Sequence, residues 1–241
     1  MIEFDEKALI SLADENGISI SHENAAILCR FAAYLSEENE KYDLTAVKDE
    51  TGIYVRHFID SLTALPYIKG NTLIDIGSGA GFPAIPTAVI RPSLSVCALD
   101  STGKRMSFVK SASEMLALTN VRAVTARAEE AAHKPELREA FDTTISRAVA
   151  KLSILAELTI PFAAVGGVII AMKGSEETAR AEIREAVGAI ETLGAMVEDV
   201  VPTRICGAGE TMNRTLVIMR KHSHTPAAYP RRYAKILKER I

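Results

Sequence analysis

Three glycines stand at alternate positions, Gly77, Gly79 and Gly81, directly after a short apolar run that contains Asp75. Glycines at this spacing let the backbone turn tightly and approach a ligand closely. A dinucleotide-binding turn would need glycine at position 82, where this chain has Phe82. The pattern therefore favours a cofactor without a pyrophosphate, such as a sulfonium amino acid joined to adenosine, with Asp75 close to its ammonium group.

A second carboxylate, Asp100, closes the next apolar run, where it can accept hydrogen bonds from both ribose hydroxyls. Ala128 and Glu129 follow the third run, at the place where an adenine edge would meet backbone groups. In a plainer interpretation the glycines form only a tight turn with a capping aspartate. The two carboxylates at strand ends favour the cofactor site, whereas Glu129 is equally well explained as the acidic start of a helix.

The elements that must position these residues alternate between short β-branched runs and helical segments. Strands are predicted at 72–76, 95–100, 121–126, 141–147 and 167–173, with helices at 84–90, 103–117, 128–133, 151–162 and 176–194. This alternation predicts an α/β fold, a parallel sheet with helices on both faces. The segments 196–205 and 215–221 are predicted to add an antiparallel edge hairpin joined by the connection 206–214.

Two helices are expected before the sheet, one near 5–15 and a longer amphipathic one that starts after Ser21. We predict three parts of the chain: an N-terminal helical extension over 1–65, a core over 66–222 and a basic C-terminal tail over 223–241. Residues 1–50 hold 12 Asp and Glu against 4 Lys and Arg, whereas residues 220–241 hold 7 Lys and Arg against Glu239 alone. For the binding of a charged partner such as a nucleic acid, this uneven distribution of charge matters more than the net charge of −3.

Several classes of protein are excluded by composition. The acidic N-terminus lacks the basic and apolar regions of a secretory signal, so we expect a cytoplasmic protein. The apolar stretch 154–172 is interrupted by Glu157, Pro161 and paired glycines, which favours a buried helix and strand over a membrane span. The three cysteines lack metal-binding or disulfide spacing, so we expect no metal site.

Beyond these local patterns, the chain resembles a known family along nearly its whole length. The segments YDLTAV, RHFIDSL, DIGSGAGFPAIP, LDSTGKRMSF, RAEE, FDTTISRAVA, AMKG and YPRR occur in the order and spacing of the ribosomal RNA small subunit methyltransferase G family, also called glucose-inhibited division protein B. The resemblance implies the Rossmann-like fold of class I S-adenosylmethionine-dependent methyltransferases and methyl transfer to N7 of a guanine in bacterial 16S ribosomal RNA. It therefore names S-adenosyl-L-methionine as cofactor and 16S ribosomal RNA, or the small ribosomal subunit, as partner.

Carried over by position, the family's cofactor contacts fall on Gly77, Phe82, Ala128, Glu129 and Arg147. Together with the residues above, the expected cofactor site comprises Asp75, Gly77, Ser78, Gly79, Gly81, Phe82, Asp100, Ala128, Glu129 and Arg147. The chain departs from the family pattern at a few positions. The family usually has Asn where this chain has Asp43, and often a Gly-type residue where it has Ala84. The usual Gly and Pro positions after YPRR are occupied by Ala234, Lys235 and Ile236.

The implied chemistry needs no general base, because guanine N7 carries no proton and attacks a methyl group with its lone pair. Arg147 is the expected catalytic residue, since a strand-end arginine can hydrogen-bond guanine O6 or a phosphate; the alternative is an ion pair with an acid such as Glu129. His57 and Asp60, three residues apart on a predicted helix, form either an acid/base pair or, as we favour, a structural contact.

Contacts to RNA are expected from cations at the strand ends and in the tail: Lys104, Arg105, Lys173, Arg231 and Arg232. Tyr229 or Tyr233 would stack on a base, although a merely solvated tail explains these residues equally well. Two other functions remain open, an S-adenosylmethionine-dependent enzyme for a small molecule and a non-catalytic cofactor-binding protein. We expect a monomer that makes no contact with a membrane.

Overall fold

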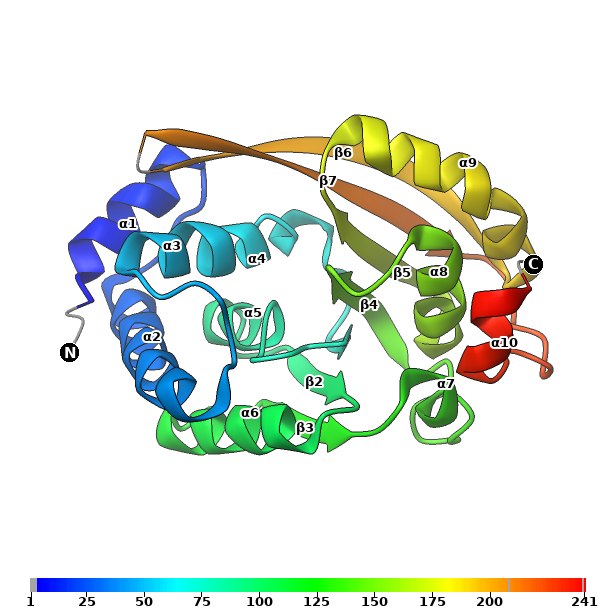
Figure 1. Cartoon of the computed structure of the whole chain (residues 1–241), viewed down its shortest axis with the longest axis horizontal. Coiled ribbons are helices and arrows are strands. Elements are labelled where there is room, and N and C mark those ends of the chain that lie inside the picture. Colours follow the sequence, from blue (N-terminus) through cyan, green and yellow to red (C-terminus); the bar gives the residue numbers. More distant parts are fainter. Residues whose placement is uncertain (1–3, 208, 240) are drawn as a thin grey trace.

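The computed structural model describes residues 4–207, 209–239 and 241, which form a seven-stranded sheet of order β3-β2-β1-β4-β5-β7-β6 (Figure 1). Strands β1 to β5 are parallel, and β7 runs antiparallel to both β5 and β6. The bounds are β1 Thr72–Ile76, β2 Ser95–Asp100, β3 Val121–Thr125, β4 Phe141–Arg147, β5 Ala163–Lys173, β6 Ala195–Gly207 and β7 Glu210–Lys221. The predicted α/β class and the antiparallel edge hairpin are confirmed.

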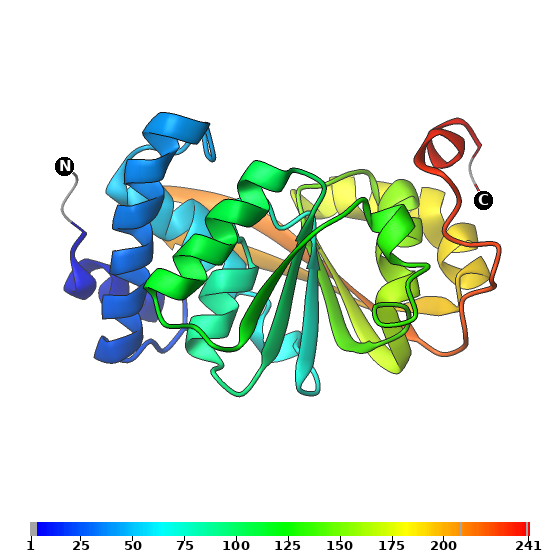
Figure 2. The ribbon, with the colours of Figure 1, turned by 90° about the horizontal axis from the view of Figure 1, so that it is seen from below.

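Helices cover both faces of the sheet, as the alternation of short strands predicts (Figure 2). One face packs against α5 (Ala84–Ile90) and α6 (Gly103–Met115), and the other against α7 (Ala128–Ala131), α8 (Leu152–Thr159) and α9 (Glu176–Thr192). A short 3₁₀ turn, Ile160–Phe162, leads from α8 into β5. Successive residues of β1 serve opposite faces, since Leu73 joins the core with α5 and α6 whereas Ile74 joins the core with α7.

The N-terminal helices pack on the α5 and α6 side of the sheet. They are α1 (Glu6–Glu15), α2 (His22–Tyr42), α3 (Glu50–Ile53), the π-helical turn η1 (Tyr54–Ile59), α4 (Asp60–Leu62) and the 3₁₀ turn Leu65–Tyr67. Helix α2 starts where Ser21 accepts a hydrogen bond from the backbone of Asn24 and ends at Asp43, whose φ of 51° is left-handed. Aspartate and asparagine both tolerate this conformation, so Asp43 suits the position. Residues 1–3 of the predicted extension lie outside the described residues.

The edge hairpin is longer than predicted. Paired strand continues to Gly207 and Glu210, so most of the segment 206–214, which we predicted as a connection, is strand. The hairpin thereby reaches the N-terminal helices, which Figure 1 shows at the far end of β6 and β7. There the side-chain amide of Asn16 pairs with the backbone N–H and C=O of Cys206, both at 2.8 Å. This side chain takes the role that a neighbouring strand would have at an edge, and a local pattern cannot reveal it.

After β7 the chain turns back over the outside of the core and ends in α10 (Tyr233–Lys238), which lies against α8 (Figure 1). Helix α10 contains Ala234, Lys235 and Ile236, the three departures from the family pattern noted above. Residues of these types sustain a helix, whereas glycine and proline would weaken or break it. The segment that we predicted as a basic tail therefore ends in a helix packed on the core.

Candidate active site

The glycine turn connects β1 to α5, at the carboxyl ends of the parallel strands. Gly77, Gly79 and Gly81 all have left-handed φ angles, of 73°, 58° and 89°, which side chains disfavour. A Cβ atom on Gly77 would collide with Val149, and one on Gly81 would lie 2.7 Å from Ile85, whereas Gly79 faces open space. Two glycines are therefore needed for close packing, and the third keeps the backbone accessible to a ligand.

The two predicted carboxylates lie on either side of this turn. Asp100, at the end of β2, accepts hydrogen bonds from the backbone N–H groups of Gly79 at 3.1 Å and Thr102 at 2.8 Å. Asp75 is fully buried, and its Oδ2 accepts a hydrogen bond from the N–H of Ala84 at 3.2 Å. Among the described residues, Asp75 Oδ1 and the buried Ser78 hydroxyl make no hydrogen bond of good geometry. Burial raises the pKa of Asp75 to about 7.

Two hollows open beside the turn. The larger, of about 650 Å³, is lined by the turn, Phe82, His57 and several cations; the smaller, of about 320 Å³, is lined by Asp100, Ala128 and Glu129. They share the residues Gly77, Arg105, Arg147 and Ala148. A third hollow of about 690 Å³, between α2 and residues 45–53, contains none of the strand-end residues, so we do not assign the chemistry to it.

The residues that line this pair of hollows are of the types that an elongated adenosyl cofactor would need. Asp100 retains lone pairs beyond the two backbone hydrogen bonds that it accepts, so it can also bind ribose hydroxyls. The segment that begins α7 brings Ala128 and Glu129 to the same hollow, as expected for an adenine contact. At the other end, the open backbone at Gly79 suits the amino-acid portion of the cofactor, whereas the fully buried Asp75 lies beneath the turn and lines neither hollow.

Phe82 connects the turn to the N-terminal helices. Its ring packs 5.4 Å from that of Phe31 in α2, and the imidazole of His57 stacks on it at 4.5 Å with an interplanar angle of 20°. The guanidinium of Arg147 lies 5.4 Å from the centre of the same ring. Burial, together with the charge of Arg147, lowers the pKa of His57 to about 4, so the imidazole is neutral near pH 7.

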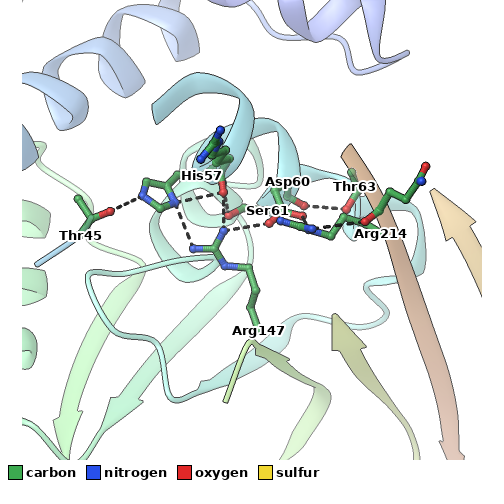
Figure 3. Close-up of polar contacts among 9 residues, drawn as sticks. Thr45, His57, Asp60, Ser61, Thr63, Arg147 and Arg214 are labelled. Carbon is green, nitrogen blue, oxygen red and sulfur yellow. Dashed lines mark hydrogen bonds and ion pairs between the residues drawn. The ribbon is translucent and has the colours of Figure 1, made fainter. Parts of the chain in front are cut away.

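The side chains of His57 and Asp60 do not bond to each other; each has other partners (Figure 3). His57 Nε2 lies 2.7 Å from the hydroxyl of Thr45, and Asp60 lies between two arginines. They belong to a π-helical turn and the residue after it, where the wider helix changes the angle between residues three apart. The structural role that we favoured for His57 and Asp60 stays a prediction, and their side-chain partners are Thr45 and two arginines instead of each other.

Arg147 leaves the end of β4 and enters the site between both hollows. Its Nη1 donates to Asp60 Oδ2 at 3.1 Å and to the carbonyl of Arg56 at 2.8 Å, and its Nη2 lies 3.4 Å from His57 Nδ1. The ion-pair partner is therefore Asp60, not the Glu129 that we considered from the sequence. Within the described part of the chain, Arg147 Nε has no hydrogen-bond partner, so this group can still donate to a ligand.

Arg214 was missed by the sequence analysis. Its Nε donates to Asp60 Oδ1 at 3.1 Å, so the almost fully buried Asp60 carboxylate holds Arg147 with one oxygen and Arg214 with the other. Arg214 belongs to the segment that we predicted as the hairpin connection, and a single arginine there gives no sign of a partner 154 residues away. Thr45 was likewise missed as a site residue, because the segment YDLTAV that contains it gives no sign of its contact with His57.

The remaining predicted RNA contacts differ in how accessible they are. Lys104 is exposed on α6, and Arg105 lies 3.8 Å from Asp100 at the edge of both hollows. Lys173 is largely buried and bonds to Glu182 at 2.7 Å and to the carbonyl of Ala150 at 2.6 Å. Its ammonium group therefore fixes the loop after β4 and has little capacity left for a phosphate.

The two tail arginines also differ from each other. Arg231 forms a two-pronged ion pair with Glu157 of α8, whose side chain is 1% exposed. Arg232, the next residue, is exposed. Only Arg232 of this pair offers its guanidinium to solvent, and thus to RNA.

Across the described ranges, no group of three or more His, Cys, Asp or Glu side chains is arranged to hold a metal ion. In the same part of the chain, no helix combines the length and the apolar character needed to cross a membrane.

Comparison with known proteins settles the family. Residues 24–206, well over half of the chain, match the model for rRNA small subunit methyltransferase G. The chain belongs to this family. It is 38% identical to the Ribosomal RNA small subunit methyltransferase G of Acetivibrio thermocellus over 95% of this chain and 93% of that one. For the Brevibacillus brevis protein of the same name, identity is 41% over 90% of each chain.

Solved structures support the fold of this methyltransferase G family member. A protein studied for the conversion of a disulfide bond into a thioacetal group during echinomycin biosynthesis superposes with a TM-score of 0.52 at 18% identity, covering 67% of this chain and 79% of that one. A Klebsiella pneumoniae protein provisionally assigned as an O-methyltransferase gives a TM-score of 0.53 at 12% identity, over 80% and 90% of the two chains. At such identities the likeness shows the fold alone, and it confirms the class I methyltransferase architecture.

Proposed function

We propose that this protein transfers the methyl group of S-adenosylmethionine to N7 of a guanine in 16S ribosomal RNA. The observation that carries the proposal is the position of Arg147: it borders the hollow with Asp100 and Glu129 and also the hollow with the cations. Its guanidinium thus lies where a cofactor and a nucleobase would meet. The family relationship supports the same conclusion, because the relatives carry the name of a ribosomal RNA methyltransferase.

Within this proposal, Asp100 binds the ribose and the backbone at Ala128 and Glu129 meets the adenine. The glycine turn with Ser78 surrounds the amino-acid portion, and Asp75 lies buried beneath the turn. When bound, the cofactor supplies an electrophilic methyl group on a sulfonium. The protein then has to hold the guanine in line and exclude water. No residue has to remove a proton, because N7 carries none.

Arg147 is the residue that we propose to contact the base. Its free Nε–H can donate to guanine O6 beside N7, and Asp60 fixes the direction of the guanidinium through Nη1. Arg105 at the edge of both hollows and the exposed Lys104 and Arg232 are proposed to contact phosphates, which makes RNA affinity decrease as salt rises. We also propose that the protein acts as a monomer, because one chain supplies every residue assigned to the site. A cytoplasmic location is proposed with it, because a ribosomal RNA substrate would be met there.

Transfer of a labelled methyl group to ribosomal RNA tests this function. The substrate is 16S ribosomal RNA, free or within the small subunit, from cells that lack the modification. We expect the label in 7-methylguanosine of the 16S RNA. Label in another nucleoside would overturn the assignment of N7, and label only in small metabolites would favour the enzyme with a small-molecule substrate. Cofactor binding without transfer to any of these substrates would favour a non-catalytic protein.

The neutral state of His57 leads to a prediction about pH. Since its pKa is about 4, His57 does not titrate between about pH 6 and 9, and the single-turnover rate at saturating cofactor should stay nearly constant over this range. His57→Gln should retain most of that rate, since glutamine can still bond to Thr45. A rate that rises tenfold per pH unit and collapses in His57→Gln would instead indicate a target atom that carries a proton.

The raised pKa of Asp75 leads to a second prediction. Protonated Asp75 is favoured in the folded protein below about pH 7, whereas the cationic cofactor favours the ionised carboxylate. Cofactor affinity should therefore rise between pH 6 and 7.5, by at most about tenfold per unit. Calorimetry on the wild type and Asp75→Asn separates this effect from titration of the cofactor itself, which both proteins experience. Equal slopes for the two proteins would show that Asp75 is not coupled to cofactor binding.

A further inference from the structure

The C-terminal segment is held on the core by contacts to its backbone. Arg138, just before β4, donates through Nη2 to the carbonyl of Thr225 at 2.8 Å and through Nη1 to that of Tyr229 at 2.9 Å. His133 Nε2 lies 2.8 Å from the carbonyl of Pro230. Contacts to backbone carbonyls define the path of a segment and leave its side chains available. The segment therefore follows a fixed path along the core.

The last of these anchors lies beside the smaller hollow. Arg231 bonds to Glu157 through both its side chain and its backbone N–H, the latter at 2.6 Å. Leu158, the residue next to Glu157 on α8, lines the hollow that contains Asp100. Helix α10 starts directly after this anchor and buries Ile236 against the core. Its first residue, Tyr233, is thereby brought to the same hollow.

Tyr233 therefore shares one hollow with the residues assigned to the adenosine. Its side chain is half-buried and lines the hollow together with Asp100, Glu129 and Leu158. An aromatic ring at such a place offers a flat apolar face on which a purine can stack, and its two rotatable side-chain bonds make ordering inexpensive in entropy. None of the anchoring contacts described above uses the Tyr233 ring.

We propose that Tyr233 is a cofactor-binding residue that closes the outer side of the adenosine site, so that the C-terminal segment forms part of the cofactor site. This inference rests on the cofactor placement proposed above. It assigns Tyr233 to the adenine and not to an RNA base, because Asp100 and Glu129 lie in the same hollow. Of the cations that line one hollow alone, Arg127 lines this one, whereas Arg56, Lys173 and Arg214 line the other. The cofactor and the C-terminal segment then stabilise each other's position.

The test is direct binding of S-adenosylmethionine, S-adenosylhomocysteine and adenosine, measured by calorimetry without RNA. Tyr233→Ala should weaken all three about 5- to 20-fold, the lower part of the range for loss of one base–aromatic stack, because the ring is only half-buried. Tyr233→Phe, which keeps the ring, should bind within about twofold of the wild type. Leu237→Ala is the matched control, because Leu237 lies on the same helix but is 55% exposed, and it should bind normally.

Further variants separate failure of this inference from failure of the cofactor placement. Asp100→Ala should weaken S-adenosylmethionine binding about 10- to 150-fold, through the loss of hydrogen bonds to a charged group. Normal binding by Tyr233→Ala alongside weakened binding by Asp100→Ala would overturn the inference alone. Normal binding by both would overturn the placement and, with it, the inference. Normal cofactor binding with a raised KM for RNA would assign Tyr233 to the RNA and also overturn the inference.

Urea unfolding confirms that each variant is folded. Should Tyr233→Ala not fold, Tyr233→Leu keeps apolar bulk without a flat ring, and the same weakening is expected of it. Normal binding by Tyr233→Leu would then overturn the inference.

Discussion

Arg147→Ala is expected to lower the single-turnover rate of methyl transfer by about 10²- to 10³-fold, the effect of removing one well-placed donor from a reaction centre. Arg147 leaves β4 between the two hollows and is held there by Asp60 and the carbonyl of Arg56. Arg147→Lys keeps the charge but loses the planar fork, so it cannot bond to Asp60, the Arg56 carbonyl and a base at once. We expect Arg147→Lys to retain about tenfold more activity than Arg147→Ala.

These rates must be measured at saturating cofactor, so that weaker binding is not mistaken for slower chemistry. Lys110→Ala is the control, because Lys110 is exposed on α6, where it pairs with Glu114 at 3.9 Å; its rate should match that of the wild type. Unfolding in urea checks that the loss of one partner of Asp60 has not disrupted the fold. A decrease of less than threefold in Arg147→Ala would remove Arg147 from the mechanism.

Arg231→Ala is expected to destabilise the protein by about 2–4 kcal/mol. This range lies above the range of about 0–1 kcal/mol for an exposed ion pair and overlaps the lower half of the range of about 3–5 kcal/mol for breaking a fully buried one. Among the described residues, the variant leaves the buried carboxylate of Glu157 with the backbone N–H of residue 231 as its one donor. Because this N–H contact remains and the ion pair lies near the surface, the loss of stability should stay below the upper limit for a fully buried ion pair.

Urea denaturation measures this effect as a lower midpoint at an unchanged slope. The adjacent Arg232 is the matched control, because it is exposed, and Arg232→Ala should change the free energy of unfolding by less than about 0.5 kcal/mol. The double variant Arg231→Ala with Glu157→Gln should recover part of the stability, since no unpaired charge is left buried. Equal stability of Arg231→Ala and Arg232→Ala would mean that the ion pair contributes nothing.

The parts of the fold that follow from local pattern could be predicted from the sequence. The run 72–76 with Gly77, Gly79 and Gly81 defines a strand and a turn within one short segment, and the structure has both there. The alternation of strands and helices after it determined the sheet. Such features depend on neighbours in the chain, so the sequence carries their signal.

The partners of the polar residues could not be predicted in the same way. The sequence suggested a contact between Asp60 and His57, which lies three residues before it. The ion-pair partners of Asp60 are instead Arg147 of β4 and Arg214 of β7. Lys173 was interpreted as a phosphate contact because it ends β5, but Glu182 in the following helix binds it. A charged residue's role depends on which distant residue neutralises it, and the spacing of residues does not encode that choice.

The reach of the hairpin has a consequence for the order in which the chain folds. The hydrogen bonds of Asn16 require Cys206, which lies 190 residues later in the chain. The ion pair between Asp60 and Arg214 can form only after β7, the second strand of the hairpin, has been synthesised. Synthesis starts at the N-terminus. The N-terminal helices therefore lack the contacts of Asn16, and Asp60 lacks Arg214, until most of the chain has left the ribosome. The arrangement around Asp60 is thus among the last to form, and nearly the entire polypeptide must be made before the site exists.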